Sequence, residues 1–565
     1  MGFIIKLLNK LKEGGNEMTK LKNSVSGIIF LMALCNLLLF ASENILKTPA
    51  ELSNFEKTST YKEVMNYIST LQNRSNDIKV EIIGNSYEGY PIPMVILAKP
   101  DFQFPNLAQK SGKSVILINA NIHAGEVEGK EACLILMREI LFGKLNYLLE
   151  KEVILIIPIF NIDGNEKIDP SHRPYQNGPS QGVGVRYNGQ NLDLNRDFIK
   201  VESPEVKSLI KVLNIWDPDV FVDLHTTDGS YHQEPLTYAG ASNPNGDIKV
   251  LEYTRNKLLP AVDKMLEEKH GYLSIPYGNF IDRTSPEKGW GGFGHLPRMG
   301  VNYVGLRNRI SILNENYAYA PYKIRIFACK GFLQSILEYC YENCDEIRKL
   351  IDEADKRTIE QFLTKPFKEF GIKFEMGILD KSLLIRSYEF EVYKDELGRK
   401  RIRKLDKTKN YIVPFYGKVE IKEKISLPYG YLIPKNLKEI VNKLIEHGIV
   451  VEKLMKNQTL KVEEYKILEI KSTERAYQGH HLNTIKVEKS VKEINFPEGT
   501  YFVDMAQPLA YLIAYLLEPQ SDDGLFTWNF FDKWIFPQWR RTYNVYPVYR
   551  LIERKEIAGK VIISN

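Results

Sequence analysis

Two residues in the segment His123-Ala-Gly-Glu126 have the types and the spacing of metal ligands. Zinc binds imidazole nitrogen and carboxylate oxygen, and a catalytic zinc site has three protein ligands and one open position. Side chains three residues apart on a helical turn face the same side, whereas Glu128 would point elsewhere. The third ligand must come from a distant segment, and His225, at the end of the apolar run 221–224, is the candidate.

The ligands need a rigid support, and four strongly apolar runs predict strands. Such runs are typical of strands buried on both faces of a mostly parallel sheet. The four runs are residues 115–118, 153–160, 220–224 and 310–313. Helical patterns alternate with them, as at 129–141 and 203–213, which predicts an α/β sandwich of a mixed, mostly parallel sheet between helices.

Polar residues follow each of the four runs. They are Asn119 and His123, Asn161 and Asp163, His225, and Asn314 and Glu315. In open α/β sheets, ligands bind beyond the carboxyl ends of the strands. Because four predicted strand ends carry polar groups, we expect them to converge on one site.

The composition is that of an ordinary globular protein, with 565 residues, 44% hydrophobic and 26% charged. After about residue 350 the pattern changes to alternating strands and a second αβ unit. The marks of this change are a strand over 382–393, a turn at 395–398, a helix over 434–449 and a second αβ unit that follows through 508–517. We therefore predict a catalytic domain over 43–350 and a C-terminal α+β domain of unknown role over 351–565.

The charge balance argues against nucleic acid as a partner. The net charge of +5 arises from 76 basic and 71 acidic residues, so no large basic excess is present. The basic run 399–409 is interpreted as a solvated hairpin. His480 and His481 have no carboxylate at metal spacing and predict a loop, and His232 is interpreted as a loop histidine rather than a rival to His225.

The first residues have the pattern of a targeting segment. Lys20 and Lys22 precede an apolar run over 25–41 that ends in small residues, which is typical of a secretory signal peptide. The alternative is an uncleaved membrane anchor. Residues 12–18 back-translate to a bacterial ribosome-binding site before an ATG, so we interpret Met18 as the natural start and 1–42 as a misassigned start plus signal peptide. These features predict a bacterial protein that is secreted or held in the periplasm or cell envelope, with membrane contact only through an uncleaved segment.

Cysteine spacing argues against a structural zinc–cysteine site. The four cysteines after the apolar run are Cys133, Cys329, Cys340 and Cys344, and they form no CxxC pair. Cys340 and Cys344 are predicted to be packed thiols rather than a disulfide, because disulfide geometry is demanding.

Five motifs, in order along residues 55–345, resemble the zinc carboxypeptidase family of the carboxypeptidase A type. The motifs are Gly84-Asn-Ser-Tyr-Glu-Gly89, His123-Ala-Gly-Glu126, Asn161-Ile-Asp-Gly164, Asn191-Leu-Asp-Leu-Asn-Arg-Asp-Phe198 and Asp223-Leu-His225. The resemblance implies one Zn²⁺ bound by His123, Glu126 and His225, and an exported bacterial member of the family with a C-terminal extension.

The resemblance also implies roles in the hydrolysis of the last peptide bond of a substrate. Asn195 and Arg196 would bind the C-terminal carboxylate, since a guanidinium matches a carboxylate in a bidentate way. Arg173, with Arg186 as the alternative, would polarise the scissile carbonyl. Glu315 would be the general base that takes a proton from water and passes it to the leaving amine.

The expected function is therefore a zinc metallocarboxypeptidase, a secreted metalloprotease acting on peptides with a free C-terminal carboxylate. Alternatives are a zinc amidase or deacylase acting on cell-wall peptides or N-acyl amino acids, and an inactive peptide-binding protein. Two departures from the family pattern bear on the substrate. Asp197 stands where many members have Asn, and the mobile tyrosine of the family is matched by either Tyr303 or Tyr319.

Overall fold

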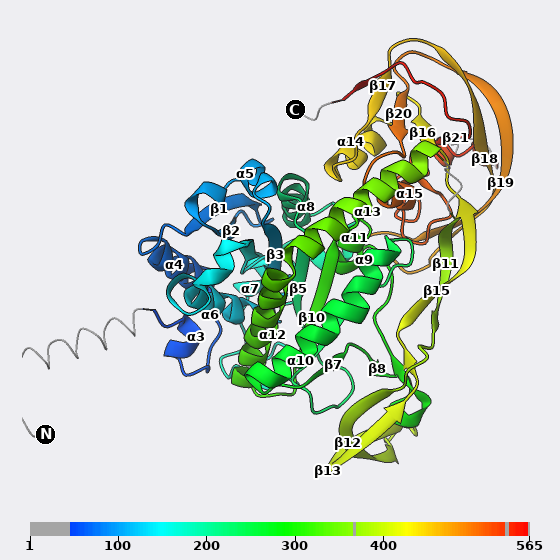
Figure 1. The fold of residues 1–565 in the computed structure, drawn as a ribbon. Coiled ribbons are helices and arrows are strands. Elements are labelled where there is room, and N and C mark those ends of the chain that lie inside the picture. Colours follow the sequence, from blue (N-terminus) through cyan, green and yellow to red (C-terminus); the bar gives the residue numbers. More distant parts are fainter. Residues whose placement is uncertain (1–45, 365–368, 537–541, 563–565) are drawn as a thin grey trace, which may run out of the picture.

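The computed structural model describes residues 46–364, 369–536 and 542–562 (Figure 1). The predicted signal peptide and the predicted start at Met18 lie outside these residues. In the part of the chain that is described, no helix combines the length and the apolar character needed to cross a membrane.

An eight-stranded sheet forms the centre of the N-terminal part of the chain (Figure 1). Its strands are, in spatial order, β1 (Ile78–Asn85), β2 (Pro91–Leu97), β4 (Glu152–Ile157), β3 (Ser114–Ala120), β5 (Val220–Thr227), β10 (Ile310–Tyr317), β6 (Leu236–Gly240) and β7 (Ser274–Pro276). Strands β3, β5 and β10 contain the apolar runs 115–118, 220–224 and 310–313, and β4 contains the first part of the run 153–160. These four strands run parallel to their neighbours among this set. Every residue of β3 and β4 is buried, which confirms the prediction of strands covered on both faces.

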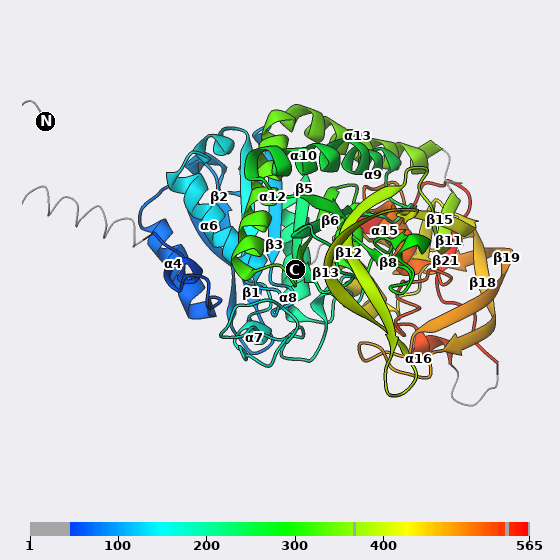
Figure 2. The same cartoon turned by 90° about the horizontal axis from the view of Figure 1, so that it is seen from below.

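Helices cover both faces of this sheet, as expected for an α/β sandwich. In Figure 2, α10, α12 and α13 lie along one face, and α8 lies on the other. The helices of this part are α3 (Pro49–Leu52), α4 (Tyr61–Gln72), α5 (Pro105–Lys110), α6 (Glu128–Phe142), α7 (Ile162–Asn165), α8 (Pro204–Trp216), α9 (Ile248–Tyr253), α10 (Leu259–His270), α11 (Gly300–Gly305), α12 (Tyr322–Glu342) and α13 (Cys344–Thr364). The predicted mixed, mostly parallel sheet between helices is confirmed.

The C-terminal part is built mainly from antiparallel strands and long hairpins. Its seven-stranded sheet consists, in order, of β19 (Asn483–Phe496), β18 (Gln458–Ser472), β21 (Tyr549–Leu551), β16 (Gly430–Ile433), β20 (Tyr501–Asp504), β17 (Glu452–Leu454) and β22 (Gly559–Val561). Two further ladders pair β11 (Glu369–Gly377) with β15 (Lys418–Ser426), and β12 (Leu383–Lys394) with β13 (Lys400–Val413). The helices are α14 (Lys438–Glu446), α15 (Ala510–Leu517) and α16 (Asp532–Ile535).

The basic run 399–409 lies in the β12–β13 hairpin and is mostly exposed, as predicted. The hairpin turn is at Asp395, whose carboxylate accepts hydrogen bonds from the backbone N–H groups of Leu397 and Arg399. The basic charges lie beside acidic side chains, for example Arg403 beside Glu391. This pairing supports a solvated surface rather than a nucleic-acid interface.

The C-terminal part packs directly on the N-terminal part. One cluster of buried apolar side chains extends from Val64 to Val548. Strand β14 (Phe415–Tyr416) also pairs with β9 (Trp290–Gly291), which in turn pairs with β8 (Asn279–Phe280). The expected boundary at residue 350 falls inside α13, a helix that ends at Thr364. The four described cysteines are free and buried, as predicted from their spacing.

Candidate metal centre and active site

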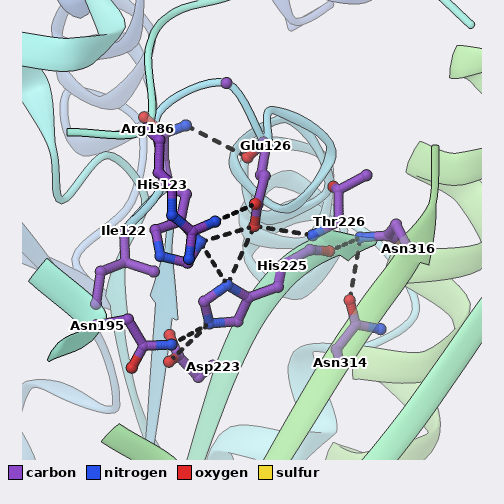
Figure 3. Close-up of polar contacts among 12 residues, drawn as sticks. Ile122, His123, Glu126, Arg186, Asn195, Asp223, His225, Thr226, Asn314 and Asn316 are labelled. Atoms are coloured by element: carbon purple, nitrogen blue, oxygen red, sulfur yellow. Dashed lines mark hydrogen bonds and ion pairs between the residues drawn. The ribbon is translucent and has the colours of Figure 1, made fainter. Parts of the chain in front are cut away.

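His123, Glu126 and His225 converge at the carboxyl ends of β3 and β5 (Figure 3). Nδ1 of His123 is 3.2 Å from Oε2 of Glu126, and Nδ1 of His225 is 3.1 Å from the same oxygen. The two Nδ1 atoms are 3.1 Å apart. Three potential ligand atoms thus face one another in a buried site.

The spacing of these donor atoms fits a zinc ion. Ligand atoms about 2.1 Å from zinc at tetrahedral angles lie about 3.4 Å from one another. The three observed separations, from 3.1 to 3.2 Å, are close to this value. Two imidazoles and one carboxylate are also the ligand set that zinc hydrolases use with one open position. Glu128 points away from this centre and binds Arg325 and Thr226, as the spacing predicted.

Each histidine is held by a carboxylate on its other ring nitrogen. Nε2 of His123 donates to Asp193 at 3.0 Å, and Nε2 of His225 donates to Asp223 at 2.9 Å. These contacts place the proton on Nε2, so that Nδ1 is free to bind metal. Sequence reasoning did not assign this role to either aspartate. A signal for Asp223 was present, because it lies two residues before His225 and therefore on the same face of β5.

Glu126 also contacts two arginines. Its Oε1 is 3.1 Å from Nη1 of Arg173 and 3.5 Å from Nη1 of Arg186. Its Oε2 accepts a hydrogen bond from the backbone N–H of Thr226. Although burial favours the neutral acid, His123 and Arg173 hold the pKa of Glu126 well below its usual value. The ligand carboxylate is therefore ionised at neutral pH.

Glu315 lies in the same cavity, which has a volume of about 300 Å³. In the parallel pair of β10 and β5, Glu315 is the register partner of His225. Burial raises the pKa of Glu315 to about 8, and the negative charge of Glu126 adds to the rise. A buried carboxyl with a raised pKa beside a metal centre has the properties of a proton-transfer group.

Asn195 and Arg196 line this cavity too, on a short 3₁₀ turn. The side-chain oxygen of Asn195 accepts a hydrogen bond from the backbone N–H of Gly300 at 2.9 Å. The guanidinium of Arg196 donates from Nη1 to the backbone oxygen of Asn195 at 2.7 Å. The structure thus brings all seven residues that the sequence assigned to the site to one cavity. They are His123, Glu126, Arg173, Asn195, Arg196, His225 and Glu315.

The two departures from the family pattern have structural explanations. Asp197 is fully buried away from the cavity, where its carboxylate binds Lys200 and the backbone and hydroxyl of Ser203. Of the two candidate tyrosines, Tyr303 is buried against His447, and Tyr319 donates to the backbone oxygen of Asp228. Neither lines the cavity, whereas Tyr277 does. Sequence reasoning missed Tyr277, because no local pattern distinguishes it.

Other polar residues at the strand ends support the site without entering it. Asn161 donates to the backbone oxygens of Ile122 and Arg186, and so connects the two loops that carry His123 and Arg186. Asp163 accepts hydrogen bonds from the backbone of Glu88 and Gly189.

Two histidines outside the centre lie where the sequence placed them. His232 is stacked on Tyr317 and lies 3.6 Å from Glu234, outside the group of three metal-ligating side chains. His480 lies in a tight turn, as predicted, but it has a carboxylate partner, Glu202 at 3.0 Å, that is distant in sequence.

The family model described as zinc carboxypeptidase matches residues 64–292. The chain is 22% identical over 485 residues to carboxypeptidase 2 of Trichophyton rubrum, which covers 82% of this chain and 81% of that protein. It is 22% identical over 459 residues to probable carboxypeptidase 2 of Arthroderma benhamiae, covering 78% and 80%. Among solved structures, the metallo-carboxypeptidase from Burkholderia cenocepacia is 16% identical, with a TM-score of 0.38, over 51% of this chain and 70% of that one.

The similarity to the fungal proteins is not confined to the catalytic region. An alignment that covers 82% of this chain cannot fit within residues 1–350, so it includes part of the C-terminal region. The family match spans the segment that carries all three ligands and also Asp193 and Asp223, which accept hydrogen bonds from the two ligand histidines. Residues 64–292 are therefore similar to the zinc carboxypeptidase family, and His123, Glu126 and His225 form the group of ligands of a metallocarboxypeptidase zinc site.

Proposed function

We propose that this enzyme removes C-terminal residues from peptides and that Arg196 and Asn195 bind the terminal carboxylate. The observation that carries the proposal is the position of these two side chains. They line the same cavity as the three zinc ligands and Glu315. A peptide whose carboxylate is bound there would place only its last peptide bond near the metal centre. An Arg guanidinium is suited to this task because it binds a carboxylate through two parallel hydrogen bonds.

Glu315 is proposed as the general base and acid. Zinc, when bound, supplies Lewis acidity that lowers the pKa of water and polarises a carbonyl. The carboxylate of Glu315 takes a proton from the attacking water, and the resulting carboxylic acid donates it to the nitrogen of the leaving amine. Burial raises the pKa of Glu315, which favours acceptance of a proton by its carboxylate.

Arg173 is proposed to stabilise the oxyanion that forms at the scissile carbonyl. Its guanidinium is held by Gln176, by Glu126 and by the backbone oxygen of Thr226. Arg186 meets the same geometric requirement, since it lines the cavity and contacts Glu126, but its Nε–H is bound to Asp193. The variants Arg173→Lys and Arg186→Lys show which arginine stabilises the oxyanion. The variant that loses this contact should have the lower kcat on the same peptide substrate.

The function is tested with a mixed peptide library. Stepwise loss of C-terminal residues, abolished by a zinc chelator and by Glu315→Gln, is the expected result. Glu396→Gln, at an exposed turn of the β12–β13 hairpin, is the matched control and should behave as the wild type. Internal cleavage, or no cleavage by protein that retains zinc, would contradict the proposal and favour the amidase or deacylase activity.

We also propose that the chain is a bacterial protein exported through the signal segment 25–41. The support is the basic and apolar pattern of residues 20–41 and the ribosome-binding pattern before Met18. N-terminal sequencing of protein from culture medium and cell envelope tests this proposal. A mature N terminus after residue 41 in those fractions is expected, and peptides that include residues 1–17 would contradict the start at Met18.

A further inference from the structure

The β18–β19 hairpin of the C-terminal part reaches the active site with the loop at its tip, residues 473–482. The two strands run side by side along their whole length (Figures 1 and 2). In the loop, the Tyr477 hydroxyl accepts a hydrogen bond from Nε of Arg196 at 3.1 Å. The side-chain oxygen of Gln478 accepts one from the backbone N–H of Asp193 at 2.9 Å. Two consecutive residues of the loop therefore bind the segment that carries Asn195 and Arg196.

The turn that presents these side chains adopts an unusual backbone conformation. Tyr477 and His480 pair through two backbone hydrogen bonds, and the residues between them have positive φ, 51° at Gln478 and 83° at Gly479. A two-residue turn with positive φ at both positions favours Asn-Gly, Asp-Gly or Gly-Gly. A glutamine at the first position is uncommon there, and its side chain is the one that binds Asp193.

Tyr477 is held rigidly although its side chain is 38% exposed. Its ring is stacked on the buried Trp528, with 6.1 Å between the centroids, and the guanidinium of Arg298 lies over both rings. The carboxylate of Asp523 accepts hydrogen bonds from Nε of Arg298 and from the indole N–H of Trp528. These contacts place the Tyr477 hydroxyl in a defined position beside Arg196.

His480 provides a second anchor for the loop. Its Nε2 is 3.0 Å from Glu202, a residue that follows the Arg196 turn and lies outside the cavity lining. The turn is thus attached to the segment 193–202 at both of its ends, through Tyr477 and through His480.

The contact at Nε determines which edge of Arg196 faces the cavity. A guanidinium can bind a carboxylate through Nε and one Nη, or through both Nη atoms. The Nε–H of Arg196 is used by Tyr477, and one hydrogen of Nη1 is used by the backbone oxygen of Asn195. The pair of N–H groups that remains for a bidentate contact is the Nη1–Nη2 edge.

We propose that Tyr477 and Gln478 are positioning residues of the carboxylate subsite, so that the C-terminal region forms part of the catalytic unit. Tyr477 orients the guanidinium of Arg196, and Gln478 holds the backbone at Asp193 from which Asn195 and Arg196 extend. The inference rests on the proposed binding of a terminal carboxylate by Arg196. Tyr477 and Gln478 themselves take no part in bond breaking.

Tyr477→Phe in the full chain is the first test, because it removes one hydroxyl and keeps the stacked ring. We expect KM for a peptide with a free carboxylate to rise about fivefold, the effect of one hydrogen bond, with kcat within about twofold of the wild type. The inhibition constant of the same peptide with a C-terminal amide should not change. Tyr393→Phe, at an exposed position of the β12–β13 hairpin, is the matched control and should leave both constants unchanged.

Gln478→Gly is the second test, because it separates positioning from folding. Glycine adopts φ of 51° without strain, and this relief offsets the lost hydrogen bond and the higher entropy of the unfolded chain, so the midpoint of thermal unfolding should change little. KM for the free acid should nevertheless rise threefold or more, since the contact with Asp193 is lost.

The two tests distinguish this inference from the proposed function. If the wild type releases no C-terminal residue, the proposed function fails. If the wild type does so but both variants keep its KM and its preference for the free acid over the amide, the positioning role is refuted. Equal losses for acid and amide would also refute it, because they would indicate a general structural effect.

Discussion

Replacement of Asp223 by asparagine should weaken zinc binding while the fold is retained. The Asp223 carboxylate is fully buried and accepts the Nε2–H of His225 at 2.9 Å and the amide of Asn119 at 3.0 Å. The substitution keeps the size of the side chain and removes its negative charge. Asn119 can accommodate the change, because its side-chain oxygen has no hydrogen-bond partner among the described residues. A flip of the Asn119 amide lets this oxygen accept a hydrogen bond from the new amide group at position 223.

The expected loss of zinc affinity follows from the role of the negative charge of Asp223. A carboxylate behind a ligand histidine fixes the orientation of the ring and raises the basicity of the atom that binds the metal, and its loss typically lowers metal affinity by about 10- to 100-fold. This corresponds to about 1.4–2.7 kcal/mol at 25 °C. We expect a value in the upper half of the range, since Asp223 and His225 are both buried and water cannot replace the contact.

The assay is competition for zinc between the protein and a chelator of known affinity. Asp219→Asn is the matched control, because Asp219 immediately precedes the same strand at the end opposite the metal site, where it accepts the backbone N–H of Val115. It should leave the zinc dissociation constant unchanged. An unchanged constant for Asp223→Asn, with both variants folded, would refute the reasoning that Asp223 prepares His225 for zinc.

Glu315→Gln should lower kcat by about 10²- to 10⁴-fold with unchanged zinc content, because the amide cannot accept the proton. Steady-state kinetics measure kcat and metal analysis measures the zinc content. Loss of zinc would contradict the assigned role of Glu315. Arg196→Lys should raise KM for free-acid peptides more than about tenfold, since a lysine cannot form the bidentate contact; an unchanged KM would place the carboxylate elsewhere. Burial raises the pKa of Asp219 to about 6, so its contribution to stability is present below about pH 4 and is lost as the pH rises through 6. Asp219→Asn should therefore gain stability relative to the wild type between pH 4 and pH 8, as measured by chemical denaturation, and a difference independent of pH would contradict this.

Local sequence patterns predicted the central sheet and the metal ligands. Strands β3, β4, β5 and β10 were predictable because residues buried on both faces must be apolar along the whole run. The pair His123 and Glu126 was predictable because their geometry depends on a single turn of backbone. His225 and Glu315 followed from the rule that parallel strands bring their carboxyl ends to one edge.

Contacts between distant segments decided the rest. The sequence motif around Asn195 was recognisable, but the role of Asp193 depends on the position of His123, 70 residues away. Arg173 and Arg186 were both candidates, and both reach Glu126 because two loops fold over the same strand ends. Asp197 departs from the family pattern beside the carboxylate-binding pair, but its side chain is buried in the interior, where it binds Lys200 and Ser203.

The sequence by itself determined the metal, its three ligands and the sheet that carries them, since these depend on residue type, short spacing and strand periodicity. Only the tertiary structure decided how the site is completed. Tyr477 reaches Arg196 across 281 residues of chain, and Gln478 reaches Asp193 across 285. No periodicity connects residues so far apart, because their meeting depends on how two separately formed sheets pack around one continuous apolar core.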